Sequence, residues 1–245
     1  MATIVPQVPP RAGQLAAAAA GQLVLLGALS AGAGLGPVGW VAGAGYAAAL
    51  LTLLTAAARR ASVTALGPAN LVTLTRAVLV GGVTALVAGG LHSGDAALAP
   101  LVVITTVALV LDAVDGRVAR RSGTASALGA RFDMEVDAFL LLVLSVWVAQ
   151  LLGPWVLAIG AMRYAFVVAG WFTPWMRAEL PPRYSAKVVA ALQGVVLTVA
   201  AGQVLPVPAS VAVVSSALAL LTWSFGRDVA WLWRNAPAAR PRGAT

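Results

Sequence analysis

The sequence contains no cysteine, a single histidine and few charged residues. Without cysteine, the chain forms no disulfide and offers no thiolate ligand to a metal. Only 10% of its residues are charged, against about a quarter in an average soluble domain. Short segments of alternating polarity, the pattern of membrane barrel strands, are also missing. By contrast, 60% of the residues are hydrophobic and the mean hydropathy is +0.91, which indicates a membrane protein built of helices.

Long apolar runs recur along the chain. A helix of about 20 such residues crosses the ~30 Å hydrocarbon core of a bilayer. We predict eight spans, at roughly 13–33, 38–58, 70–90, 97 to the acidic segment described below, 129–152, 154–175, 185–204 and 208–233. The predicted fold is an all-α polytopic membrane protein. Its parts are a disordered N-terminus (1–12), a transmembrane hairpin (13–60), a six-helix membrane domain (61–235) and a disordered tail (236–245).

The formal charge of +8 is unevenly distributed between the two sets of connections. Basic residues lie at alternate loops or helix ends, namely Arg59, Arg60, Arg76, Arg117, Arg120, Arg121, Arg131, Arg177, Arg183, Lys187, Arg227 and Arg234. The other connections carry only His92 and Asp95. By the positive-inside rule, both termini and the acidic segment face the cytoplasm, in a cell membrane. The basic excess meets anionic lipid headgroups, and no basic, aromatic-bearing soluble segment exists that would bind nucleic acid.

The N-terminus admits a second interpretation. Arg11, the Ala-rich apolar run after it and the small residues "SAGAG" resemble a secretory signal peptide. The second span follows at once and ends in Arg59-Arg60, which favours a retained helical hairpin.

Five of the eight acidic residues fall in one segment, 111–139. They are Asp112, Asp115, Asp133, Glu135 and Asp137. On helices, Asp112 and Asp115 share one face, as do Asp133 and Asp137, whereas Glu135 points elsewhere. A tight turn near "RSGTAS" between two antiparallel helices would bring the two Asp pairs together. Four clustered carboxylates repel one another, and hard cations such as Mg²⁺, Mn²⁺ or Ca²⁺ resolve that conflict.

Small and basic neighbours suit a phosphate ligand at this cluster. Two cations bridged by Asp side chains would clamp phosphate oxygens during an in-line displacement. Gly116, Ala119 and Gly129 lack bulk and would let a ligand approach closely, and Arg120 offers a planar fork to phosphate. The alternative is a set of ordinary interfacial ion pairs. We favour that alternative for four residues only: Glu135, Arg117, Arg121 and Arg131.

The segment resembles the signature of the CDP-alcohol phosphotransferases. The matching positions are Asp112-x-x-Asp115-Gly116-x-x-Ala119-Arg120, then eight residues, then Gly129-x-x-x-Asp133-x-x-x-Asp137. "PANLVTLTR" (68–76) is similar to the opening of the first core helix of that family, with Asn70, Thr73 and Arg76 in register. "SAKVVAALQ" (185–193) is similar to the start of the fifth core helix, although Ala186 replaces the common Gly. The resemblance covers about residues 66–233, so the first two spans are an addition to a six-helix core.

The resemblance implies a phospholipid-synthesising transferase. Members move a phosphate-linked group from a CDP-alcohol, often CDP-diacylglycerol, to an acceptor alcohol and release CMP. The family would place Asp112, Asp115, Asp133 and Asp137 on two divalent cations, Mg²⁺ or Mn²⁺, with Asp137 also the base for the acceptor hydroxyl. Gly116 and Ala119 would accommodate the cytidine nucleotide. The family also suggests a homodimer.

Three further basic residues are candidates for the acceptor site. Arg163 lies near the middle of the sixth span, a costly position for a charge. We predict that it lines a polar cavity and binds an acceptor phosphate, as an Arg does in family members that use glycerophosphate. The alternative is a structural pair with Asp133 or Asp137. Arg183 and Lys187 would contact phosphate or anchor lipid headgroups. These features favour glycerol 3-phosphate over inositol phosphate, with other alcohols left open.

Two other classes of function compete with the enzyme. A transporter that uses the Asp cluster for ions or protons would show inverted repeats and charges near the bilayer midplane. Here the acids gather at predicted cytoplasmic helix ends and the motif does not repeat. A catalytically silent membrane scaffold of the same fold has no need of four clustered acids.

Overall fold

The computed structural model describes residues 10–60, 68–95, 97–122, 127–178, 180–181 and 183–235. Its elements, in chain order, are α1 (Pro10–Ala33), α2 (Pro37–Arg60), α3 (Pro68–Ser93), α4 (Leu98–Ser122), α5 (Ala127–Leu152), the 3₁₀ turn η1 (Pro154–Val156), α6 (Leu157–Phe172), the 3₁₀ turn η2 (Pro174–Arg177), α7 (Tyr184–Ala201) and α8 (Val207–Arg234). Every element in the described residues is helical. The predicted all-α class is therefore confirmed.

Proline and glycine mark the helix boundaries. Helices α2 and α3 begin at Pro37 and Pro68. Proline is tolerated in the first turn of a helix, because N–H groups there have no acceptor within the helix and the N–H that proline lacks is not needed. Between α5 and η1, Gly153 adopts a φ of 109°, which a glycine tolerates, and Pro154 follows it. The predicted break lies at this place. Helix α1 begins at Pro10, inside the predicted disordered segment 1–12; residues 1–9 and 236–245 lie outside the described part of the chain.

Seven of the helices in the described residues are long and apolar enough to cross a bilayer, which makes the chain a multi-pass membrane protein. The eighth predicted span corresponds to α4, whose side chains are described only as far as Ala113. The described part, Leu98–Ala113, is apolar. Asp112, Asp115 and three arginines occupy the last turns of this helix.

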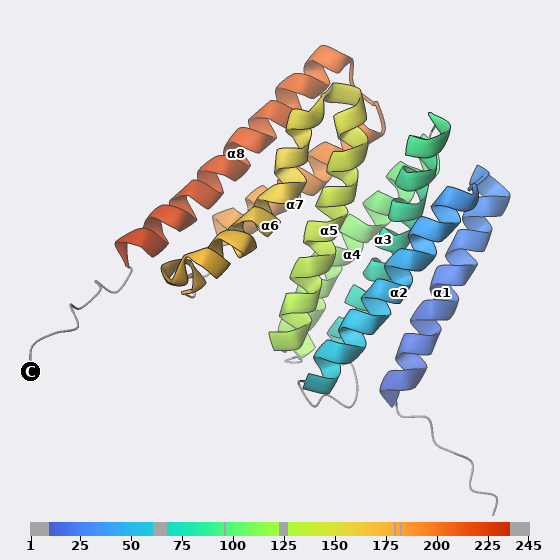
Figure 1. Cartoon of the computed structure of the whole chain (residues 1–245), viewed down its shortest axis with the longest axis horizontal. Coiled ribbons are helices and arrows are strands. Elements are labelled where there is room, and N and C mark those ends of the chain that lie inside the picture. Colours follow the sequence, from blue (N-terminus) through green and yellow to red (C-terminus); the bar gives the residue numbers. More distant parts are fainter. Residues whose placement is uncertain are drawn as a thin grey trace, which may run out of the picture.

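Helix α3 is the centre of the bundle. It packs against α1 and α2 on one side and against α4 and α5 on the other. Helices α6 and α7 pack against α5, and α8 packs against α7 (Figure 1). The predicted N-terminal hairpin thus lies beside the helix that opens the predicted six-helix domain. Because α3 and α5 begin, and α4 ends, at the same end of the bundle, their terminal turns come together there.

Small residues allow close contacts between helices, as Gly160 and Gly81 illustrate. A Cβ built on Gly160 of α6 would lie 2.5 Å from the Cα of Leu142 on α5, so the two backbones nearly touch there. On α3, Gly81 leaves room for the buried side chain of Gln22 from α1. Lipid tails are as apolar as the helix surfaces, so such close van der Waals contacts, rather than apolar burial from water, hold membrane helices together.

Candidate active site

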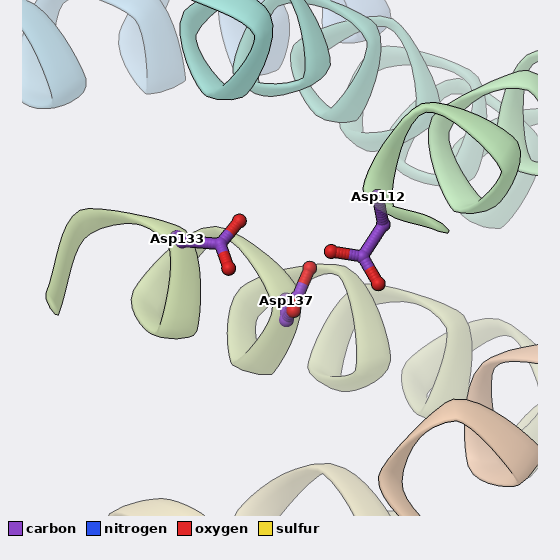
Figure 2. A group of neighbouring side chains, drawn as sticks. All are labelled: Asp112, Asp133 and Asp137. Atoms are coloured by element: carbon purple, nitrogen blue, oxygen red, sulfur yellow. The ribbon is translucent and has the colours of Figure 1, made fainter. Parts of the chain in front are cut away.

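Three carboxylates from α4 and α5 meet beside α3, the helix against which both of them pack. Asp112 comes from α4, and Asp133 and Asp137 lie one turn apart on α5. Figure 2 shows the Asp112 side chain pointing toward Asp137 on the neighbouring helix. One carboxylate oxygen from each residue lies within 4.8 Å of the other two. The structure therefore brings together three of the four predicted metal ligands.

A buried arginine completes this cluster. Arg76, from the third turn of α3, has its Nη1 atom 2.9 Å from the Oδ1 atom of Asp112. Nη1 also donates a hydrogen bond to Asp133, and Nη2 donates one to Asp137. The Arg76 side chain is 1% exposed, whereas the three carboxylates are 36–39% exposed. The guanidinium therefore lies beneath the carboxylates, and they form the accessible rim.

The position of Arg76 corrects one sequence interpretation. The charge pattern grouped Arg76 with the basic residues at loops and helix ends, but the structure buries it within the bundle. The three carboxylates explain why a charge is tolerated there, because a buried guanidinium needs paired and hydrogen-bonded partners. The sequence did contain a signal for this burial. The predicted span starts near Asn70, so Arg76 lies about six residues inside an otherwise apolar span, and a charge inside a span needs a partner.

The donor set fits a hard divalent cation. Three carboxylates and one guanidinium leave two formal negative charges, which one divalent cation balances. All the acidic donors are oxygens, as Mg²⁺ and Mn²⁺ prefer, and no His or Cys belongs to the group. The partial exposure of the carboxylates leaves them open to an ion from solvent. The arrangement can therefore bind a cation and, with it, phosphate oxygens.

For several predicted site residues the structure describes the backbone but not the side chain. Asp115, Gly116, Ala119 and Arg120 belong to the last turns of α4, and Asn70 to the first turn of α3, but their side-chain surroundings are not described. Two others are placed. Thr73 is buried one turn before Arg76 on α3, on the same face of the helix. Gly129 is buried in the first turn of α5.

Arg163 pairs with Glu135 and with neither of the acids suggested as its alternative partners. Its Nη2 atom lies 2.5 Å from Oε1 of Glu135, between α6 and α5. The Arg163 side chain is 27% exposed, and its Nε atom is buried without a hydrogen-bond partner. The sequence predicted an ordinary ion pair for Glu135 without indicating which arginine, and the structure shows that this arginine is Arg163. The acceptor-binding role of Arg163 stays a prediction.

The remaining acceptor candidates lie at α7. Arg183 precedes this helix and pairs with Asp228 of α8 at 3.0 Å, where both side chains are largely buried. Lys187, one turn into α7, is exposed. Next to Asp228, Arg227 donates a hydrogen bond to Ser185 and stacks over the Trp223 ring at 4.7 Å. Arg183 therefore has a structural partner that the sequence did not indicate, and Lys187 is free to meet solvent or headgroups.

Comparison with known proteins identifies the family. The family model for CDP-alcohol phosphatidyltransferase matches residues 66–226, about two thirds of the chain. The match begins just before α3 and ends within α8, so it contains all the described cluster residues and leaves out α1 and α2. Searches of curated proteins and of solved structures gave no match. The matched range and the acidic cluster inside it lead to one conclusion: the chain belongs to the CDP-alcohol phosphatidyltransferase family, whose members transfer a phosphatidyl group from a CDP-alcohol within a membrane.

Proposed function

We propose that the protein transfers the phosphatidyl group of CDP-diacylglycerol to a phosphorylated polyol, glycerol 3-phosphate ahead of inositol phosphate, and releases CMP. The observation that carries this proposal is the cluster of Asp112, Asp133 and Asp137, with ligand oxygens within 4.8 Å of one another, inside the family match. The preference for a phosphorylated acceptor rests on Arg163, a cation within an apolar span.

The chain supplies cation ligands, phosphate contacts and a base. Asp112, Asp133 and Asp137 would hold one divalent cation, Mg²⁺ or Mn²⁺, and Asp115 would help them to hold a second. Such cations, when bound, neutralise charge on the transferred and leaving phosphates. Arg120 would bind a phosphate oxygen, and Gly116, Ala119 and Gly129 would let the nucleotide approach. Asn70 and Thr73 would contact its phosphates from α3.

The reaction is one displacement at phosphorus. Asp137 would accept the proton of the acceptor hydroxyl as the oxygen attacks the phosphatidyl phosphorus. A new phosphorus–oxygen bond forms to the acceptor, the bond to CMP breaks, and the electron pair leaves with CMP. No covalent enzyme intermediate is required. Arg163 would hold the acceptor phosphate, with Arg183 and Lys187 near the entrance.

The setting of the enzyme is part of the proposal. The acyl chains of a lipid donor would stay in the bilayer while the headgroup reaches the terminal turns of α3, α4 and α5. Following the charge asymmetry of the loops, we place these turns at the cytoplasmic face of a cell membrane. We also infer a homodimer, as the family resemblance suggests.

The test is CMP release from the purified protein. Detergent-solubilised protein with CDP-diacylglycerol and Mg²⁺ or Mn²⁺ is expected to release CMP only when the correct acceptor is added. Asp137→Asn should reduce the rate by a factor on the order of 10² to 10⁴, the range typical of a lost acid–base residue. Asp95→Asn is the matched control, because Asp95 is exposed in the α3–α4 connection, and its rate should equal that of the wild type. Absence of CMP with every acceptor, from folded protein that binds Mn²⁺, would contradict the proposed donor.

A further inference from the structure

The arginine in the carboxylate cluster raises a question that the proposed reaction does not answer. Arg76 contacts the Oδ1 atoms of Asp112, Asp133 and Asp137, one from each carboxylate. These three residues are also the ones whose oxygens would hold a cation. Arg76 thus already neutralises part of the charge that a divalent cation would neutralise.

Electrostatics makes the two positive groups compete. A guanidinium and a divalent cation repel each other. Each also stabilises the negative charge of the same carboxylate oxygens, so the presence of one reduces what the other gains by binding there. In water this competition would be small, but Arg76 is 1% exposed, so the surroundings screen its charge weakly. The carboxylates can be reached from their exposed side, and a cation would approach from the side opposite the guanidinium.

We propose that Arg76 is the internal counter-cation of the unloaded site: it holds the three carboxylates of α4 and α5 together before a divalent cation binds, and it gives up some of these contacts as the cation binds. This inference rests on the proposed cation site. Two consequences follow. The unloaded protein keeps the three helices together without metal, because the three carboxylates are already paired with Arg76. Cation affinity is weaker than three bare carboxylates would give, because binding must displace an existing ion pair.

Calorimetry and thermal unfolding of the full chain in detergent test the inference without reference to activity. In Arg76→Met the EDTA-treated protein should unfold at a lower temperature than the wild type, since three like charges lose their partner. The same variant should bind Mn²⁺ more tightly, with the Kd lower by about tenfold or more, because the competing positive charge is gone. Arg183→Met is the matched control. It also removes a largely buried arginine with one acidic partner, and its Mn²⁺ affinity should stay that of the wild type.

The sign of the affinity change decides between two roles for Arg76. If Arg76 is merely structural, or if it keeps its contacts in the loaded site, the variant should bind Mn²⁺ with unchanged or weaker affinity. Either result would overturn the inference and leave the transferase proposal intact. A wild-type protein that binds no Mn²⁺ would overturn both.

A second variant covers the case of a folding failure. Arg76→Gln is also neutral, but its amide can donate hydrogen bonds to the carboxylates, and it should show the same tighter Mn²⁺ binding. If both variants fold only when Mn²⁺ is present throughout purification, the counter-cation role in the unloaded protein is supported. If neither folds even then, Arg76 is required in the loaded state and the inference fails.

Discussion

At the scale of single residues, α5 presents acids on two faces. Asp133 and Asp137 lie one turn apart and share a face, whereas Glu135, two residues from each, lies on another side of the helix. Each face has its own arginine: Arg76 of α3 pairs with the two Asp residues, and Arg163 of α6 pairs with Glu135. Helix α5 therefore separates the buried Arg76 from the partly exposed Arg163, and the two arginines have different predicted roles.

Arg163→Gln tests the acceptor role. If Arg163 binds an acceptor phosphate, the loss of its charge-assisted hydrogen bonds, worth about 1.5–3 kcal/mol, should raise the KM of a phosphorylated acceptor by roughly 10- to 100-fold with little change in kcat. Steady-state CMP release measures both constants. Glu135→Gln is the control, because it removes the carboxylate partner and keeps the guanidinium, so its acceptor KM should not rise. Equal effects of the two substitutions would mean that Arg163 serves only as the partner of Glu135.

At the scale of elements, close backbone contacts hold the helices that carry the site. Gly160 lets α6 approach α5 at Leu142, and this contact sets where Arg163 meets Glu135. On the other side of the bundle, Leu26 of α1 is fully buried beside Gly43 of α2. The N-terminal hairpin also packs against α3, the helix that positions Arg76, with Gln22 of α1 next to Gly81 of α3.

Gly160→Ala should destabilise the protein. The new methyl group would lie 2.5 Å from the Leu142 Cα atom, which is backbone and cannot rotate away, so α6 must move off α5. We expect a loss of about 1–3 kcal/mol in the free energy of unfolding, seen as a lower melting temperature in detergent. Gly45→Ala on α2 is the matched control, because no atom lies within 4 Å of its added Cβ. A melting temperature for Gly160→Ala as high as that of the control would argue against this close packing.

At the scale of the whole molecule, the polar chemistry is confined to one end of an apolar bundle. The cluster lies near the shared ends of α3, α4 and α5 (Figure 1). Acids and arginines occupy the last turns of α4, where this helix reaches the site. The proposed reaction needs such a boundary, because its lipid donor lies in the bilayer and its proposed phosphorylated acceptor comes from water.

Cysteine labelling tests the proposed orientation, and the cysteine-free wild type provides an unlabelled background. Ser93→Cys places an exposed thiol at the end of α3 far from the cluster, and Ala178→Cys places one in the connection between α6 and α7. A membrane-impermeant maleimide should label the first variant in intact cells and the second only after the membrane is opened. The reverse pattern would place the cluster on the outer face.

The sequence by itself determined the class of the protein, the approximate helix boundaries and the acidic residues of the site. These features are local: hydropathy is read along a single segment, and the spacing of Asp133 and Asp137 places them on one helix face wherever that helix lies. The family signature is also local, because its residues lie at fixed intervals within one short segment. The resemblance of this segment to the family therefore indicated the class of reaction from the sequence alone.

Only the tertiary structure decided which charges meet. Arg76 lies 57 and 61 residues before the two α5 acids with which it pairs, and no local pattern specifies a partner at that distance. The same holds for Arg163 of α6 with Glu135 of α5, and for Arg183, just before α7, with Asp228 of α8. In a membrane these pairings depend on how closely helices pack at small residues, and that geometry exists only once the bundle has formed.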